Sequence, residues 1–480
     1  MHLLRSNKMI GRQKEQKRLM EAYNSDSSEF VVVYGRRRVG KTFLVNEVFG
    51  GKIAFQHTGV AKAKMKQQLV YFRDSLEDAG CEDCPALKTW HDAFRHLQKH
   101  LESLPEGRKV VFIDELPYMA TKNSDCVMSL EHFWNGWAAR RKDVLLIVCG
   151  SAASWLLKKI IANKGGLHNR VTLKILLTPF TLSECEQYAA EKKLGYSRKQ
   201  ICECYMALGG IPFYWKPLER GLSVAQNMDQ LFFARDAVLK HEYDELYTSL
   251  FDSPEPYMKI VEALGENGGG LTRDEISAAC GIPSGGVLTK YIADLEDCGF
   301  IQRMKNYGKD ANGQVIRLID NYTLFYFKFL LNNAGGDESF WSNSAEAQFR
   351  KVWSGLAFER VVIQHASRIK AKLGIAGVRT SVSCWRHRAD DVWPKGAQID
   401  MLIDRADDIV NVCEVKFCKG KYTVDREEYD AIENRRAAFE KLAANGKGVH
   451  VTMITTEGLA ANKYADDIQS DVTLDDLFAP

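Results

Sequence analysis

The sequence contains no segment that could cross a membrane as a helix, since no run approaches the roughly 18 consecutive apolar residues that a span requires. Residues 1–15, MHLLRSNKMIGRQKE, lack the apolar core of a secretory signal peptide. The net charge over 480 residues is only +3, too small to predict by itself a strong attraction to nucleic acid or to a membrane surface. We therefore expect a protein that is neither secreted nor membrane-bound, and we place it in the cytoplasm.

The twelve cysteines do not form the spacing pattern of a disulfide framework. They are scattered among apolar neighbours, which predicts reduced thiols. Cys81 and Cys84 have the spacing of a zinc-binding pair, but neither a second pair nor a histidine lies at finger distance. Cys202 and Cys204 fall on different faces of a predicted helix, one in the core and one on the surface. The sequence therefore predicts no zinc site.

The length and composition indicate several folded domains. At 480 residues the chain exceeds what one ordinary hydrophobic core serves, so two to four domains are expected. A hydrophobic content of 45% and a charged content of 26% are typical of a soluble globular protein.

Residues 30–48, FVVVYGRRRVGKTFLVNEV, predict a phosphate-binding loop between a buried strand and a helix. The pattern G-x-x-x-x-G-K-[ST] lies where such a loop requires it. Its glycines let the backbone N–H groups surround a polyphosphate, its lysine reaches the β and γ phosphates, and its threonine can bind Mg²⁺. The residues expected to bind the nucleotide are Gly35, Arg36, Arg37, Arg38, Val39, Gly40, Lys41, Thr42 and Phe43.

A second strand predicted to end in acidic residues follows at 109–115, KVVFIDE. Asp114, at the carboxyl end of a parallel strand, can hold Mg²⁺ through water, and Glu115 can orient and polarise the attacking water. Together with the metal-binding Thr42, these residues predict Mg²⁺-dependent hydrolysis of a nucleoside triphosphate.

Two further positions are candidates for contacts to the phosphates. The strand predicted at 144–148 is followed by Ser151, which is placed to sense the γ-phosphate; Ser154 is the alternative. Arg170, in a glycine-rich loop before the next strand, can stabilise transition-state charge in cis or from a neighbouring subunit. An arginine that merely lies on the surface is the rival interpretation of Arg170.

The order of the elements predicts an α/β fold. Strands alternate with helices as far as residue 177, which favours a parallel sheet covered by helices, and a helical lid is expected over 181–215. Residues 253–320 then predict three short helices and two strands, the pattern of a winged helix. Its third helix carries Asp294, Glu296 and Asp297 against Lys290, so an inter-domain or lid role is favoured over duplex binding.

A second chemical centre is predicted in a hairpin of residues 398–403 and 409–416. With the turn centred on Asp407, Asp400 lies opposite Glu414, and Glu414 shares a sheet face with Lys416. With Glu359 nearby from a preceding helix, these groups predict a Mg²⁺ site that could polarise a phosphodiester. A hairpin whose charges simply face solvent is the alternative; valines at 410 and 412 on the same face argue against it.

Taken in order, these motifs resemble the archaeal-type ATPases, a prokaryotic family within the AAA+/STAND group of P-loop ATPases. The likeness covers about residues 8–330. It implies that Arg12 lies near the adenine and that Pro212 contacts the nucleotide from the lid. No guanine-binding N/T-K-x-D signature is present, which agrees with ATP over GTP. The resemblance is carried by Gly11-Arg12-x-x-Glu15, Gly35 to Thr42, Ile113-Asp114-Glu115, Gly150-Ser151, Arg170 and Gly209-Gly210-Ile211-Pro212.

The C-terminal order Glu359…Asp400…Glu414-x-Lys416, followed by a helix and a strand, resembles the PD-(D/E)XK nuclease fold over about residues 345–460. It also resembles the C-terminal domain that accompanies these ATPases. The resemblance implies metal-dependent binding or cleavage of DNA.

The sequence thus predicts a P-loop ATPase domain with a helical lid over 1–250, a winged helix with a connecting helix over 251–340, and an α/β restriction-endonuclease-like domain over 341–480. ATP or ADP, Mg²⁺ and DNA are the expected ligands, and further copies of the chain are expected partners. The alternative is a nucleotide-dependent switch whose winged-helix and C-terminal domains only bind DNA or a protein.

Overall fold

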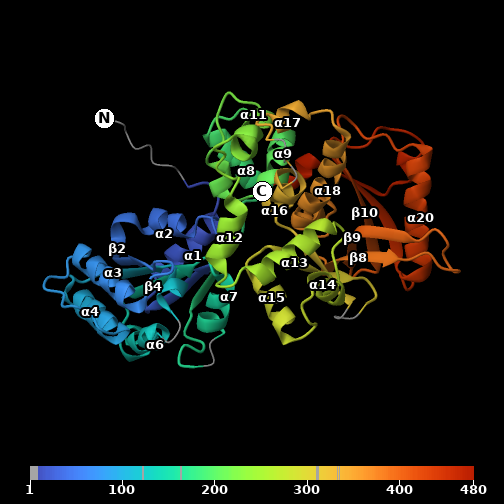
Figure 1. The fold of residues 1–480 in the computed structure, drawn as a ribbon. Coiled ribbons are helices and arrows are strands. Elements are labelled where there is room, and N and C mark those ends of the chain that lie inside the picture. Colours follow the sequence, from blue (N-terminus) through green and yellow to red (C-terminus); the bar gives the residue numbers. More distant parts are fainter. Residues whose placement is uncertain are drawn as a thin grey trace. The chain divides into compact units, whose positions relative to one another are not determined.

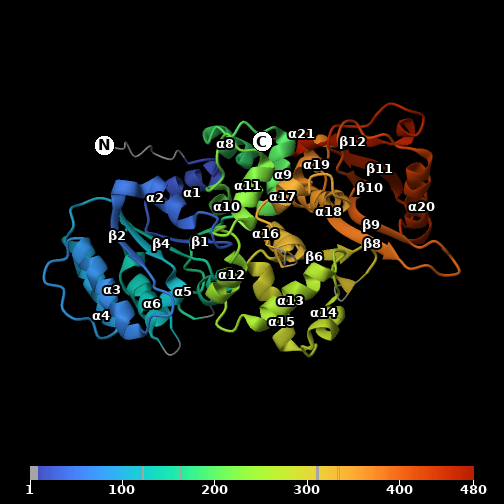
Figure 2. The same ribbon diagram turned by 45° about the horizontal axis from the view of Figure 1, so that its top comes forward.

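The computed structural model describes residues 9–121, 124–162, 165–309, 313–331, 333 and 336–479. The chain separates into two compact units, Met1–Pro179 and Phe180–Pro480 (Figures 1 and 2). The helical segment that follows residue 180, expected from the sequence to be the lid of the ATPase domain, belongs to the second unit. The division at 250/251 and 340/341 stays a prediction.

The first unit contains a five-stranded sheet in the order β2-β3-β4-β1-β5, in which every pair of neighbours is parallel. This confirms the predicted α/β arrangement. Strands β3 and β4 are buried along their whole length, as their apolar runs indicate. The strands are β1 (Glu29–Tyr34), β2 (Ile53–Thr58), β3 (Lys109–Asp114), β4 (Val144–Gly150) and β5 (Leu173–Leu176).

Helices cover both faces of this sheet. Helices α3, α4 and α6 lie on one face, and α1 and α2 on the other (Figures 1 and 2). The core of the first face is aromatic: the Phe72 ring meets those of Trp90 and Phe94 edge-on, with centroids 5.6 and 5.8 Å apart. The helices are α1 (Gln13–Tyr23), α2 (Lys41–Phe49), α3 (Met65–Asp78), α4 (Trp90–Ser103), α5 (Leu116–Met119), α6 (Cys126–Gly136) and α7 (Ala153–Leu156).

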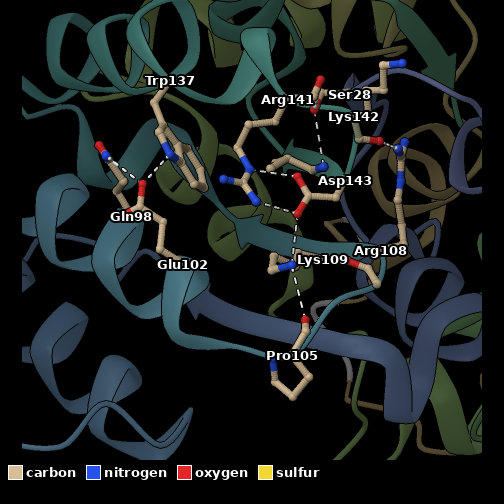
Figure 3. A network of polar contacts seen from close by, with 12 residues as sticks. Ser28, Gln98, Glu102, Pro105, Arg108, Lys109, Trp137, Arg141, Lys142 and Asp143 are labelled. Carbon is tan, nitrogen blue, oxygen red and sulfur yellow. Dashed lines mark hydrogen bonds and ion pairs between the residues drawn. The ribbon is translucent and has the colours of Figure 1, made fainter.

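A polar network ties together the amino ends of β3 and β4 (Figure 3). Asp143 accepts hydrogen bonds from Arg141 Nε at 2.7 Å and Lys109 Nζ at 2.9 Å, and these bonds hold the pKa of Asp143 well below its usual range. Arg108 donates to the carbonyls of Ala22 and Lys142. Because these are the amino ends of parallel strands, the network lies at the edge opposite the phosphate-binding loop and serves the fold.

The second unit contains a seven-stranded mixed sheet in the order β12-β11-β10-β9-β8-β6-β7. The hairpin of β6 and β7 joins the C-terminal strands because β6 pairs in parallel with β8, with Lys305 opposite Ser383. One sheet therefore contains strands from both sides of residue 340. The strands are β6 (Ile301–Asn306), β7 (Val315–Leu318), β8 (Thr380–His387), β9 (Ala397–Arg405), β10 (Ile409–Lys416), β11 (Gly448–Thr455) and β12 (Ser470–Thr473).

The helices of the second unit form two groups. The group around α9 includes the aromatic residues Tyr322, Phe325 and Phe329, all of which are buried. A shorter group, α13 to α15, precedes β6, and α20 packs against β9 and β11. The helices are α8 (Leu182–Glu191), α9 (Arg198–Leu208), α10 (Pro212–Trp215), α11 (Val224–Met228), α12 (Glu242–Leu250), α13 (Glu255–Glu266), α14 (Arg273–Cys280), α15 (Gly286–Asp297), α16 (Asn321–Phe325), α17 (Phe340–Asn343), α18 (Gln348–Gln364), α19 (Ala366–Lys372), α20 (Arg426–Leu442) and α21 (Leu474–Leu477).

The predicted winged-helix segment contains its expected elements, including the capping box of Thr272 and Glu275 at the start of α14. Asp294, one of the acids of the third helix, is buried and accepts a 2.8 Å hydrogen bond from the Tyr257 hydroxyl. The assignment as a winged helix stays a prediction.

The cysteines are all free thiols, as predicted. The prediction that one of Cys202 and Cys204 lies at the surface is wrong, because both are fully buried. Helix α9 is packed against α8, α16 and α18, so it has no single solvent face along this stretch. Among the described residues, no helix combines the length and apolar character needed to span a bilayer.

Candidate functional site

The phosphate-binding loop follows β1 and leads into α2, as the sequence predicts. Gly35 has φ +140° and Gly40 φ +92°, backbone conformations that favour glycine. A Cβ on Gly35 would lie only 2.2 Å from the carbonyl oxygen of Leu177, so no other residue fits there without a shift of the backbone. The loop and the amino end of α2 form a geometry suited to anion binding.

Lys41 is buried, and its ammonium donates to the loop carbonyls of Gly35 at 3.1 Å and Arg36 at 2.9 Å. These contacts hold the ammonium over the loop. Phosphate oxygens are stronger acceptors than neutral carbonyls, so an incoming polyphosphate can take these donors over.

Thr42 and Asp114 converge from α2 and β3, although 72 positions separate them in the chain: Thr42 Oγ1 donates to Asp114 Oδ2 at 2.6 Å. The other carboxylate oxygen, Oδ1, accepts from the backbone N–H of Glu115 at 2.8 Å and lies 2.6 Å from Cys149 Sγ. A hydroxyl and a carboxylate are the oxygen ligands that Mg²⁺ prefers when phosphates supply the rest, so these residues fit a Mg²⁺–nucleotide complex.

Glu115 directly follows β3 with φ +47°, a conformation that non-glycine residues seldom adopt. Its Oε2 accepts hydrogen bonds from Ser151, the first residue after β4: from the backbone N–H at 3.0 Å and from the hydroxyl at 2.9 Å. The strained turn directs the carboxylate toward the neighbouring strand end. The two adjacent strands thus bring the predicted water-orienting and phosphate-sensing residues together.

The remaining residues that were predicted to contact the nucleotide lie in several parts of the structure. Arg12 is buried, with Nη2 donating to the carbonyl of Thr178 at 2.6 Å. Arg170 is exposed in the loop before β5, so neither interpretation of it gains support. Pro212 begins α10 in the second unit, and its contact with the nucleotide stays a prediction. In the loop itself, Val39 and Arg36 are buried, Arg37 and Arg38 are half-buried, and Phe43 is exposed.

The C-terminal hairpin has the predicted register. Strands β9 and β10 are antiparallel, with Val410 opposite Asp404 and Cys413 opposite Met401, which centres the turn on Asp407. The next position along this register places Glu414 opposite Asp400.

Glu359, on α18, lies within electrostatic reach of both carboxylates of the hairpin. Burial, followed by the negative charges of Asp400 and Glu414, raises the pKa of Glu359 to about 7. Burial also raises the pKa of Glu414, while Arg435 and Lys416 oppose that shift. The three acids predicted from the sequence therefore gather at one place, between a helix and two strands.

Each carboxylate of the hairpin is paired with a cation. Arg317 Nη2, from β7, lies 3.2 Å from Asp400 Oδ1. Arg435 Nη2, from α20, lies 3.1 Å from Glu414 Oε2. Lys416 lies 3.5 Å from Glu414 and 2.9 Å from Glu428, also on α20. In the part of the chain that the structure describes, no three His, Cys, Asp or Glu side chains form a ready metal site.

Sequence reasoning missed Glu428 and Arg435 as members of this centre. They lie seven residues, or about two turns, apart on α20 and so share one face of that helix. That spacing was visible in the sequence, but the strand against which the face packs was not.

Comparison with known proteins gives one family match. Residues 9–218 match the model of an ATPase domain that occurs predominantly in Archaea. An uncharacterised protein of Methanocaldococcus jannaschii, MJECL04, is 24% identical over 387 residues, which cover 80% of this chain and 83% of the relative.

Among solved structures, the Walker-type ATPase PABY2304 of Pyrococcus abyssi aligns at 17% identity and a TM-score of 0.47, over 67% of this chain and 96% of its own. The ORC2 protein of Aeropyrum pernix, in ADPNP and ADP complexes, aligns at 14% identity and a TM-score of 0.41, over 71% and 98%. TM-scores below 0.5 do not establish a common fold over such lengths.

Proposed function

We propose that this chain, whose residues 9–218 match the model of an ATPase domain that occurs predominantly in Archaea, binds ATP with Mg²⁺ and hydrolyses it at the carboxyl edge of the β1–β5 sheet. One observation carries the proposal: the contact between Thr42 and Asp114 at 2.6 Å, directly beside the loop that holds Lys41. It brings a hydroxyl, a carboxylate and an ammonium to the same strand ends, which is what a Mg²⁺–triphosphate requires.

The residues would divide the work as follows. The loop N–H groups and Lys41 bind the β and γ phosphates, while Thr42 and Asp114 hold Mg²⁺, which neutralises the charge that develops on the phosphate oxygens. Glu115 orients the attacking water and accepts its proton. The Ser151 hydroxyl is within reach of the same carboxylate, so a γ-phosphate that draws this hydroxyl away would free Glu115 to meet the water.

The proposal extends to the C-terminal centre, where Asp400 and Glu414 would bind a divalent metal, and Glu359 and Lys416 would assist that metal in the cleavage of DNA. Their electrostatic coupling supports this extension, because neighbouring acids with a nearby lysine suit metal-assisted attack on a phosphodiester. In this interpretation ATP turnover licenses or drives the cleavage.

A second function is favoured by a different observation: Arg317 and Arg435 already neutralise Asp400 and Glu414. A metal would have to displace both cations. If it does not, the centre is an ion-pair network, and the protein is a nucleotide-dependent switch whose second unit binds DNA or a protein partner without cutting it.

One experiment separates these functions. ATP turnover and cleavage of linear, circular and single-stranded DNA are measured with Mg²⁺ and with Mn²⁺, for the wild type and for Asp400→Asn, Glu414→Gln and Lys416→Ala. ATP turnover in the absence of DNA should persist in all of them. The nuclease proposal expects cleavage by the wild type, its loss in both acid variants and slower cleavage in Lys416→Ala.

Asp407→Asn is the matched control, since Asp407 lies in the same hairpin and pairs with Arg405 away from the centre. It should cut as the wild type does. Normal ATP turnover without any cleavage or calorimetric metal binding by the wild type would leave the switch as the function.

A further inference from the structure

A small hollow, with about 50 Å³ of space for water, lies beside the C-terminal centre, between the β6–β7 hairpin and α18. Its charged wall consists of Arg317, Glu359, Arg360 and Asp400. Much of the remaining wall is apolar and includes Met304 and Ile363. The mixture of an apolar wall with a few charged groups is that of a ligand site.

Arg360 has no evident structural purpose in this wall. Its Nε and Nη2 atoms are shielded from solvent and, among the described residues, have no hydrogen-bond partner. Shielded guanidinium N–H groups without hydrogen bonds are costly, and the cost is recovered when an anion binds. The nearest charge that acts on Arg360 is its neighbour Glu359.

Arg317 also lines a second hollow, with about 190 Å³ of space for water. Its guanidinium is fixed in place: Nε donates to the carbonyl of Gly269 at 3.2 Å, and Nη2 to Asp400 Oδ1 at the same distance. The second hollow adds two exposed arginines from β8 and the loop after it, Arg386 and Arg388. Four arginines therefore line the two hollows, together with the acids Glu359, Asp400 and Glu275.

We propose that the two hollows form one groove for a single strand of nucleic acid, in which a backbone phosphate is bound between Arg317 and Arg360. Arginine suits this role because its planar fork matches phosphate oxygens. The apolar wall suits an unpaired base, because a single strand exposes its base faces whereas a duplex stacks them inside. The identification of the ligand as nucleic acid rests on the proposed function of the C-terminal centre. The arrangement of the arginines is an observation that does not depend on that function.

The test measures binding without chemistry. A single-stranded oligonucleotide of about 20 residues, labelled at its 3′ end, is titrated with the full chain in EDTA, and fluorescence anisotropy is followed at several salt concentrations. Arg360→Gln and Arg317→Gln should each weaken binding about tenfold. Each should also lower the slope of log affinity against log salt by about 0.7, the value for one lost contact to a single-strand phosphate.

Lys351→Gln is the matched control, because it removes the same charge from an exposed position on α18 away from the hollow. It should bind as the wild type does. Arg360→Lys keeps the charge without the fork and should restore only part of the affinity. If Arg360→Gln fails to fold, Arg386→Gln at the exposed end of the groove replaces it and should show the same change in slope.

Two results would overturn the groove: an Arg360→Gln variant that binds like Lys351→Gln, or a wild type that prefers a duplex of the same sequence. The outcome is independent of the nuclease assay. Arginine-dependent binding without cleavage in Mg²⁺ or Mn²⁺ keeps the groove and removes the nuclease. Cleavage by the wild type, together with unchanged binding by Arg360→Gln, keeps the nuclease and removes the groove.

Discussion

The Glu115 carboxylate accepts two hydrogen bonds from Ser151, at 3.0 Å from the backbone N–H and 2.9 Å from the hydroxyl. The contact joins the ends of β3 and β4. In this position the Glu115 carboxylate already accepts hydrogen bonds from Ser151, so it is not free to bind only the attacking water. We therefore propose that Ser151 acts on hydrolysis through Glu115, as a positioning residue.

The first prediction concerns this contact. Glu115→Gln should leave ATP bound and slow hydrolysis by about 10²–10⁴-fold, the range for a positioned general base. Ser151→Ala should slow it by about tenfold at unchanged ATP affinity, and it should add no further loss to Glu115→Gln, because the two residues act through one contact. Steady-state turnover and ATP titration measure both effects.

Ser154→Ala is the control for the Ser151 variant, since Ser154 was the alternative sensor. Wild-type turnover is expected for it. A large loss in Ser154→Ala with none in Ser151→Ala would transfer the role to Ser154.

The second prediction is that Lys41→Ala abolishes hydrolysis and weakens binding of ATP·Mg²⁺ by about 10–100-fold. The phosphates lose a fixed cation, and a hydrogen bond to a charged group contributes about 1.5–3 kcal/mol. Isothermal titration gives the affinity. Lys17→Ala, at an exposed position on α1, should bind normally; equal affinities in the two variants would remove the assignment of the loop.

The third prediction tests Arg170 in assemblies of the chain. Arg170→Ala should lower turnover if the arginine stabilises transition-state charge. If it does so across a subunit boundary, mixing this variant with Lys41→Ala should restore part of the activity, since each supplies what the other lacks. Mixed oligomers demonstrated by mass spectrometry but showing no recovery would exclude action in trans, and unchanged turnover in Arg170→Ala alone would leave it a surface arginine.

The fourth prediction is a pH dependence of stability that arises from His57 on β2. Burial lowers its pKa from 6.5 to about 4, so the folded state keeps it neutral while the unfolded state takes up a proton below pH 6.5. The contribution of neutral His57 to the free energy of unfolding is complete above pH 6.5 and is lost as the pH falls toward 4. Between pH 7.5 and 4.5 the wild type should lose about 2–3 kcal/mol more than His57→Phe, at 1.36 kcal/mol for each pKa unit.

Urea denaturation at the two pH values measures this difference. His132→Phe, at an exposed histidine on α6, serves as the comparison and should lose as much as the wild type. An equal loss in His57→Phe and the wild type would show that His57 does not contribute.

The phosphate-binding loop could be predicted in full because its information is local. Gly35 to Thr42 is one continuous stretch, and the glycine positions, the strand before it and the helix after it specify the backbone without reference to distant residues. The hairpin register was predictable for a related reason: once the turn is centred on Asp407, the alternation of the strands fixes which residue faces which.

The local sequence pattern did not reveal which distant residues pack against a given face of a helix or strand. The sequence placed Asp400 and Glu414 together, but not the arginines that neutralise them, because Arg317 and Arg435 come from elements 83 residues before and 21 residues after their partners. For the same reason the sequence wrongly predicted that one of Cys202 and Cys204 lies at the surface, because it did not show that their helix is enclosed on several sides.

The sequence by itself thus determined which residues have the chemistry for phosphate and metal binding, since identity and spacing set what each segment can do. Only the tertiary structure decided how those groups are used. The pairing of β6 with β8 brings Arg317 to Asp400, and the packing of α18 buries Arg360 beside them. The physical reason is that a charge acts on whatever lies within a few ångströms of it, and packing, not sequence distance, sets those neighbours.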